Sequence, residues 1–126
     1  MNILGLGVDI VETARIAASI ERHGEPFLRR IFTDAEIAYC SQMKDPSQCY
    51  AARFAAKEAV SKAFGTGIGA DLGWRDIEVQ RRDTGAPFIL LTGTGAATAG
   101  RLGIREVRIS LSHSEHYAVA NAIAVG

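Results

Sequence analysis

Side chains capable of chemistry gather in two short segments of the sequence. Glu58 and Lys62 lie four residues apart in a stretch with a helical pattern, which ends at a glycine-rich turn. This spacing places a carboxylate and an ammonium on one face of a helix, beside backbone amides suited to phosphate. Asp9 interrupts an apolar run where a core strand would carry an aliphatic residue, so its carboxylate needs a partner. Together these groups suit a divalent metal held against a polyphosphate.

Each of these residues also has a purely structural interpretation. Asp9 could satisfy backbone groups at a bend, and Glu58 with Lys62 could be a surface ion pair of about 0.3–0.5 kcal/mol. The turn after Lys62 favours the chemical interpretation, because Gly65 and Thr66 supply flexible amides and a hydroxyl there. A helix C-terminus has the wrong dipole for an anion, so a phosphate would depend on Lys62 and the turn amides.

The same helix carries further candidates. Arg53 and Lys57 form a second stripe that is expected to be solvated, and either side chain could reach a phosphate. Phe54 shares the stripe of Glu58 and Lys62, so it is expected to line the same cleft.

Positive charge is also concentrated on the first predicted helix. Arg15 and Arg22 lie there, although the whole chain is neutral, with 14 basic and 14 acidic residues. This face is a candidate docking surface for an acidic protein, and an ordinary solvated face fits the pattern equally well. His113 stands at the end of a predicted strand and could cap the following turn. Trp74 and Tyr117 are expected to be aromatic residues of the core or of an interface.

The apolar pattern and its turns predict an α+β fold, with a mostly antiparallel sheet and one long helix packed against it. Strands are expected over 3–11 (mostly buried), 76–81, 87–91, 106–112 and 117–125, and helices over 12–23, 27–31, 34–41, 48–64 and 94–102. Ala52, Ala56, Ala59 and Ala63 form a ridge of small residues along the long helix, which would permit close packing. Gly65 is expected to end this helix in the left-handed conformation.

At 126 residues the chain, 1–126, has the length of a single domain. Its balanced charge argues against a nucleic-acid-coating protein. No segment has the length of a membrane span and the first residues lack the pattern of a secretory signal, so a soluble, cytoplasmic protein is expected. Cys40 and Cys49 lack CxxC spacing and a histidine at zinc spacing, so reduced thiols are expected rather than a disulfide or a zinc site.

Two segments resemble the signatures of the holo-acyl-carrier-protein synthases, the small bacterial type of 4′-phosphopantetheinyl transferase. The first runs from Gly7 to Glu12 and the second from Arg53 to Gly67, and similarity covers nearly the whole length. The resemblance implies transfer of the phosphopantetheine arm of coenzyme A to a serine of apo acyl carrier protein. Adenosine 3′,5′-bisphosphate would be released, and the pathway would be fatty acid biosynthesis.

The resemblance also implies roles for particular residues. Mg²⁺ is the expected metal, bound by Asp9 and Glu58 together with the pyrophosphate of coenzyme A. Lys62 would contact phosphate and serve catalysis together with the two carboxylates. The turn at Gly65 and Thr66 would lie along the cofactor.

A homotrimer with active sites between protomers is implied as well. The segment around His113 would reach the nucleotide bound by a neighbour, and Arg53 joins it as a candidate cofactor-binding residue. Arg15 and Arg22 fall on the helix that resembles the carrier-docking surface, and Phe54 is a further candidate for partner contact.

The residues alone leave open which group acts as the base and which function the chain has. The serine proton could be taken by Glu58 or by a water polarised by the metal, because a carboxylate that binds Mg²⁺ tightly is a weak base. Two other functions fit the same residues. One is a module that retains coenzyme A or another nucleotide without turnover, and the other is a structural oligomer assembled through the alanine ridge.

Overall fold

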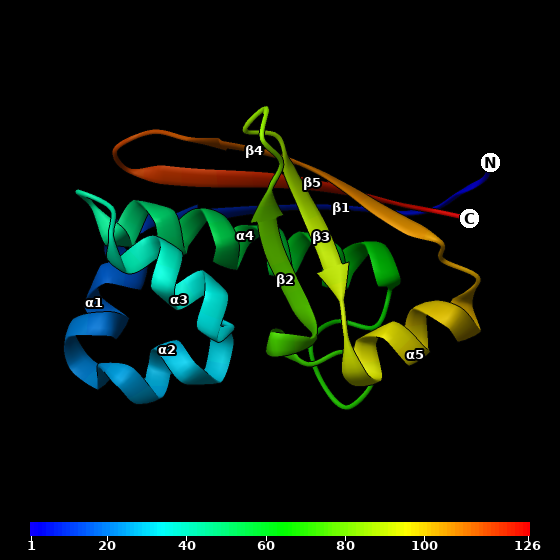
Figure 1. The fold of residues 1–126 in the computed structure, drawn as a ribbon, viewed down its shortest axis with the longest axis horizontal. Coiled ribbons are helices and arrows are strands. Elements are labelled where there is room, and N and C mark those ends of the chain that lie inside the picture. The colour runs from blue at the N-terminus through cyan, green and yellow to red at the C-terminus, as the bar shows by residue number, and fades with distance from the viewer.

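The computed structural model describes residues 1–126 as two antiparallel sheets with helices packed mainly on one side of the larger sheet (Figure 1). The larger sheet has the order β1-β5-β4, with β1 at Ile3–Glu12, β5 at Tyr117–Val125 and β4 at Glu106–His113. The smaller sheet is the hairpin of β2 (Ile77–Arg81) and β3 (Pro87–Leu91). The predicted α+β class is confirmed, with the difference that the hairpin forms a sheet of its own.

Five α-helices and one short 3₁₀ helix complete the fold. They are α1 (Thr13–His23), α2 (Glu25–Ile31), α3 (Asp34–Ser41), α4 (Pro46–Phe64), the 3₁₀ helix η1 (Trp74–Asp76) and α5 (Gly93–Leu102). The long helix α4 begins two residues earlier than predicted, because Pro46 suits a first helical turn and the Asp45 side chain accepts from the Gln48 amide. It ends at Gly65 in the left-handed conformation, as predicted (φ 80°). None of the helices combines the length and apolar character needed to cross a bilayer.

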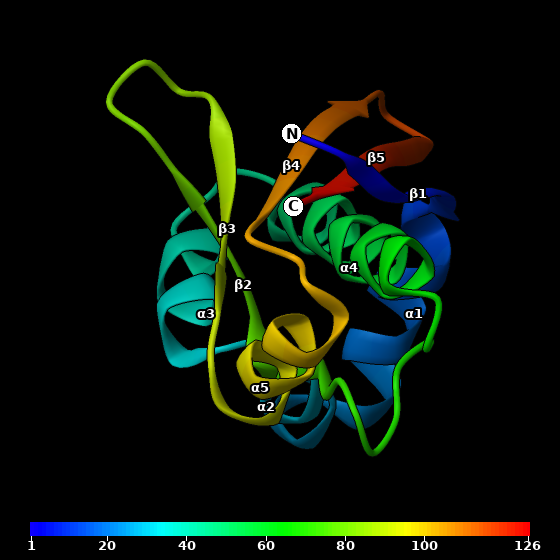
Figure 2. The same ribbon diagram turned by 90° about the vertical axis from the view of Figure 1, so that its right-hand side faces the viewer.

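Helix α4 lies directly on β1, as Figure 2 shows. A Cβ atom on Gly7 would stand 1.8 Å from the Ala59 carbonyl oxygen, and one on Gly5 would stand 1.8 Å from that of Ala63. The predicted alanine ridge is therefore matched by glycines on the strand. Because alternate residues of a strand share a face, the next residue toward α4 is Asp9.

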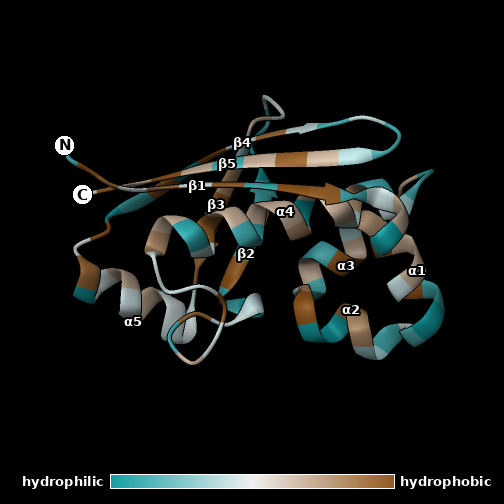
Figure 3. Cartoon of the chain, turned by 180° about the vertical axis from the view of Figure 1, so that it is seen from behind, coloured by the Kyte–Doolittle hydropathy of each residue, from teal (hydrophilic) through white to brown (hydrophobic).

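The other face of β1 is not covered by any helix. Leu6, Val8 and Ile10 are 67%, 55% and 63% exposed, and Leu6 stands opposite Ile123 of β5, another exposed aliphatic residue. Figure 3 shows this hydrophobic colouring along β1 and β5. The prediction that residues 3–11 form a mostly buried strand is thus wrong for the single chain, because α4 covers only one of the two faces.

Candidate active site

A cavity of about 480 Å³ opens between the end of β1 and the helices α1, α2 and α4. Asp9 and Glu58 both line it, although 49 residues separate them in the sequence. Asp9 arrives from β1 through the close contact with α4, and Glu58 lies on α4 one residue before Ala59, which touches Gly7. The structure therefore brings the two predicted metal ligands to one cavity.

The Lys62 ammonium connects α4 to β1 by hydrogen bonds beside this cavity. Its Nζ atom donates to the Val8 carbonyl oxygen at 2.9 Å and to the Asp9 Oδ1 atom at 3.2 Å. The Asp9 side chain is largely buried, whereas that of Lys62 is half exposed. Lys62 thus pairs with Asp9 rather than forming the simple helical ion pair with Glu58.

Glu58 is the carboxylate of the pair whose ionisation is disfavoured. Burial raises the pKa of Glu58, the negative charge of Asp9 raises it further, and Lys62 partly offsets both effects. A shared cation would relieve this repulsion. Asp9 and Glu58 would supply two carboxylates to such a cation, and the structure contains no group of three or more His, Cys, Asp or Glu side chains placed to hold a metal. This donor set fits Mg²⁺, which commonly binds one or two carboxylates, water and substrate phosphates.

Further residues line the cavity, and several of them were not identified as site residues from the sequence. Phe54 lines the cavity, as its helical stripe with Glu58 predicts. Arg15 of α1 lies there as well, and Tyr117 borders the cavity from the start of β5. The Phe54 ring stacks on Trp74 with the ring centroids 5.0 Å apart. The lining residues that were not assigned to the site from the sequence are Ile10, Val11, Glu12, Ile16, Ser19, Phe27 and Tyr117. Ser19 lies four residues after Arg15 and shares its helical face, so this spacing was a usable signal.

The other predicted residues on α1 and after α4 lie outside this cavity. Arg22 borders a shallow hollow on α1 together with Arg15. Gly65 and Thr66 are exposed and follow Lys62 by one turn, and the Thr66 hydroxyl donates to the Gly67 carbonyl oxygen at 2.9 Å.

Arg53 and His113 line a second cavity, of about 650 Å³. They are not brought together with Asp9 and Glu58 in this chain. The separation follows from helical geometry, because residues 53 and 58 of α4 project about 140° apart around the helix axis.

The expectation that Arg53 is solvated is wrong, because this residue is only 2% exposed. The guanidinium lies 4.6 Å from the centre of the Tyr39 ring, and its Nη1 atom donates to the Cys49 sulfur at 3.1 Å. The Nε atom is buried without a hydrogen-bond partner. Burial lowers the pKa of Arg53, and the charge of Glu36 opposes that effect.

Lys57 is buried with no exposed surface and, unlike Arg53, lines neither cavity, so it cannot reach a phosphate as the sequence suggested. Its Nζ atom forms a buried ion pair with the Glu36 Oε1 atom at 2.8 Å. It also donates to the Trp74 carbonyl oxygen at 3.0 Å and to that of Ile77. Burial lowers the pKa of Lys57, and Glu36 opposes this. Lys57 therefore joins α4 to α3, η1 and β2.

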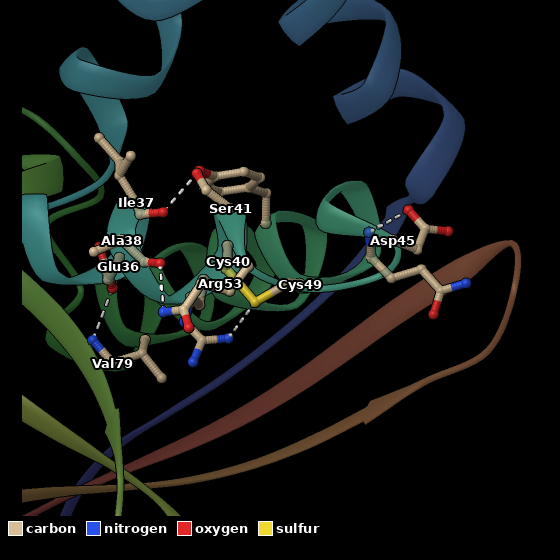
Figure 4. The surroundings of a disulfide bond; sticks show 12 residues. Glu36, Ile37, Ala38, Cys40, Ser41, Asp45, Cys49, Arg53 and Val79 are labelled. Carbon is tan, nitrogen blue, oxygen red and sulfur yellow. Dashed lines mark hydrogen bonds between the residues drawn. A yellow bond between two sulfur atoms is a disulfide. The ribbon is translucent and has the colours of Figure 1, made fainter.

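Cys40 and Cys49 form a disulfide, so the expectation of reduced thiols is wrong (Figure 4). The chain turns back between α3 and α4 and brings the two Cα atoms to 5.4 Å, within the range of disulfides. Spacing in the sequence does not reveal this approach, because it depends on how the two helices pack.

Comparison with known proteins identifies the family. The sequence pattern of the 4′-phosphopantetheinyl transferase superfamily matches residues 5–122. A holo-[acyl-carrier-protein] synthase from Koribacter versatilis is 50% identical over 121 residues, which cover 96% of this chain and 97% of the relative.

Solved structures agree with the sequence match. The crystal structure of the holo-[acyl-carrier-protein] synthase from Neisseria meningitidis has a TM-score of 0.93 at 34% identity, covering 99% of this chain and 100% of the other. The Helicobacter pylori synthase, crystallised in complex with coenzyme A, has a TM-score of 0.85 at 33% identity, covering 95% and 99%.

The chain therefore belongs to the 4′-phosphopantetheinyl transferase superfamily and, within it, to the holo-[acyl-carrier-protein] synthases. The resemblance seen in its two signature segments is confirmed, and the chain is an enzyme of the transferase class.

Proposed function

We propose that this enzyme moves the 4′-phosphopantetheine arm of coenzyme A to a serine hydroxyl of apo acyl carrier protein, with Mg²⁺ as its cofactor. The products are holo acyl carrier protein and adenosine 3′,5′-bisphosphate, and the pathway is fatty acid biosynthesis. The observation that carries the proposal is the meeting of Asp9 and Glu58 at one cavity, with Lys62 bonded to Asp9.

The reaction needs negative charge to be neutralised and a proton to be removed. The serine oxygen forms a bond to the β-phosphorus of coenzyme A while the bond to the bridging oxygen breaks, and that oxygen leaves with the bisphosphate. Bound Mg²⁺ would neutralise charge on both phosphates. Lys62 adds a positive charge beside Asp9. The raised pKa of Glu58 makes it a better proton acceptor than an ordinary glutamate, although a bound cation would reduce that advantage.

We assign the cofactor contacts to two protomers of a trimer. Asp9, Glu58 and Lys62, with the turn at Gly65 and Thr66, form one half of each site. Arg53 and His113 line the separate second cavity, and they form the other half for a neighbour. The exposed aliphatic residues of β1 and β5 support association through the open sheet face, since such a surface favours burial against another copy. The relative crystallised with coenzyme A supports coenzyme A as the donor substrate.

Mass spectrometry tests the reaction directly. Incubation with coenzyme A, Mg²⁺ and an apo carrier protein should add about 340 Da to the carrier, the mass of a transferred phosphopantetheine. Asp9→Ala and Glu58→Ala variants should give no product while keeping the fold. A carrier that other transferases modify, but that this enzyme leaves unchanged, would reject the proposal.

Carrier docking is assigned to Arg15 and Arg22, with Phe54 at the cavity that both α1 and α4 border. Reversing both charges, in Arg15→Glu with Arg22→Glu, should raise the KM for an acidic carrier about tenfold or more and leave coenzyme A affinity unchanged. The salt dependence of the KM should also weaken. Carrier kinetics identical to those of the unmodified enzyme would remove this surface from the assignment.

A further inference from the structure

We propose that the Cys40–Cys49 pair is a redox switch for the second cavity, and that the disulfide form binds the phosphate groups of coenzyme A more tightly than the dithiol form. The inference rests on the proposed function, because that proposal assigns Arg53 to the cofactor. It concerns regulation of the same site.

The geometry connects the sulfur of Cys49 to Arg53 directly. Cys49 lies in the first turn of α4, one turn before Arg53, and both residues line the second cavity. The Arg53 Nη1 atom donates to the Cys49 sulfur at 3.1 Å, as Figure 4 shows. Arg53 is almost completely buried, and its Nε atom has no partner. The guanidinium is therefore held in place at the wall of the cavity, where its positive charge can attract an anion.

The two oxidation states present different partners to Arg53. A disulfide sulfur is neutral and a weak acceptor, so it leaves the charge of Arg53 free for a phosphate. A reduced Cys49 would lie near the N-terminus of α4 and beside Arg53, two features that favour the thiolate. A thiolate paired with Arg53 would compete with the phosphate.

The other charged and titratable groups of the cavity support the same direction. Lys44 and Arg81 add two cations, and Asp45 is the one carboxylate among the lining residues. Tyr39 and His113 complete the titratable set. The excess of positive charge favours the thiolate of Cys49 over the thiol.

The redox step is an exchange with a small disulfide such as glutathione disulfide. Cys49 is partly exposed at the cavity and Cys40 is completely buried, so Cys49 reacts first. Its thiolate attacks one glutathione sulfur, the S–S bond breaks, and the departing thiolate takes up the proton that Cys49 lost. The Cys40 thiol then displaces the second glutathione from the mixed disulfide. Two protein thiols are oxidised and one glutathione disulfide is reduced to two thiols.

Calorimetry on the fully oxidised and fully reduced enzyme tests the inference. The probe is adenosine 3′,5′-bisphosphate, because coenzyme A carries a thiol that would itself exchange. Reduction should weaken binding at least about fivefold, the lower end of usual coupling between two equilibria. Adenosine, which lacks phosphate, should show no difference. Equal bisphosphate affinity in both states would overturn the switch and leave the transferase proposal standing. Absence of binding in both states would overturn the cofactor assignment as well.

Thermodynamic reciprocity gives a second readout that does not depend on activity. If oxidation strengthens bisphosphate binding, saturating bisphosphate must shift the exchange equilibrium with glutathione toward the disulfide by the same factor. Titration of the protein in glutathione buffers, with and without bisphosphate, measures that shift. An exchange constant that does not change would contradict the inference.

Two single variants separate the Arg53 contact from the cross-link itself. Cys40→Ala keeps the Cys49 thiol beside Arg53, so it should bind bisphosphate as weakly as the reduced enzyme. Cys49→Ala removes that sulfur and should bind as tightly as the oxidised enzyme. Neither variant should respond to reductant. Weak binding by both would show that the cross-link matters and the Arg53 contact does not, which would overturn the proposal. Should either variant fold poorly, the comparison of oxidised and reduced unmodified enzyme still decides.

Discussion

Asp9 and Glu58, two carboxylates of the first cavity, differ in how far a nearby positive charge balances them. Asp9 has the Lys62 ammonium at 3.2 Å, whereas Glu58 is partly buried and faces the charge of Asp9. The pKa of Glu58 is therefore raised by folding. In the pH window between the ordinary and the raised pKa, the folded protein binds more protons than the unfolded chain. The free energy of unfolding of the metal-free protein thus decreases as the pH rises through that window.

This charge conflict predicts that Glu58→Gln gains stability while it loses activity. In metal-free buffer at neutral pH, the variant should melt about 2 °C higher, because one of two repelling carboxylates is gone. Mg²⁺ should raise the melting temperature of the unmodified protein more than that of the variant. Calorimetric melting with and without Mg²⁺ checks both statements. A metal response equal in the two proteins would remove Glu58 from the metal site.

At the level of the elements, the position of Asp9 depends on the contact between α4 and β1. That contact tolerates no side chain at Gly5 or Gly7, since a Cβ atom at either would collide with a helix carbonyl oxygen. A displaced helix would also move Glu58 and Lys62 away from Asp9. The glycine and alanine residues thus position the site without touching a ligand.

Gly7→Ala should cost about 2–4 kcal/mol of unfolding free energy, because the backbones of β1 and α4 must move apart to accept the methyl group. Gly100→Ala is the matched control. Gly100 lies within α5, where an added Cβ atom would meet open space. This substitution should therefore leave stability unchanged or slightly increased. Urea unfolding of both variants measures the contrast. Equal stability of the two variants would mean that α4 and β1 are not held this closely.

The buried pair of Lys57 and Glu36 gives a second prediction about the elements. Lys57→Met should cost about 3–5 kcal/mol, since it leaves the Glu36 carboxylate buried without its counter-charge. Adding Glu36→Gln should cost less than the sum of the two single changes. The exposed pair of Arg29 and Glu25 is the control, and Arg29→Met should have little effect. Additive costs at Lys57 and Glu36 would contradict the direct pairing.

Helical and strand periodicity were enough to predict much of this arrangement. The bounds of α3, β3 and β5 agree with prediction, as does the left-handed Gly65, because each depends on local caps, turns and alternation. Periodicity shows which side chains share a face but not what covers that face. The burial of Arg53 and Lys57 depends on α3 and β2, which pack on α4 from elsewhere in the chain. The disulfide and the open face of β1 were missed for the same reason.

At the scale of the whole molecule, Asp9 and Glu58 line one cavity and Arg53 and His113 line another, on different sides of α4. The proposed site uses both sets and draws them from two copies of the chain. Asp9 and Glu58 would then come from one protomer, and Arg53 and His113 from its neighbour.

Mixing inactive variants tests this sharing. Asp9→Ala damages one half-site, and His113→Glu places a negative charge against phosphate in the other half. Each variant alone should be inactive. The two variants are then dissociated and reassociated in equal amounts. In a closed ring each half-site comes from an unmodified position in about half of the cases, so about a quarter of the complete sites should be intact. A mixture of Asp9→Ala and Glu58→Ala is the control and should recover nothing. Failure of the first mixture to regain activity would place all four residues in one protomer.

The proposed association through the uncovered side of β1 and β5 would make thermal stability a function of protein concentration. It would bury Leu6, Val8 and Ile10 only while the copies remain together, so mass action would enter the melting temperature. Dilution would then lower the melting point of an otherwise unchanged sample. Melting temperatures of variants are comparable only at matched molar concentration, and a substitution on this face would alter that dependence before it altered the fold of the chain.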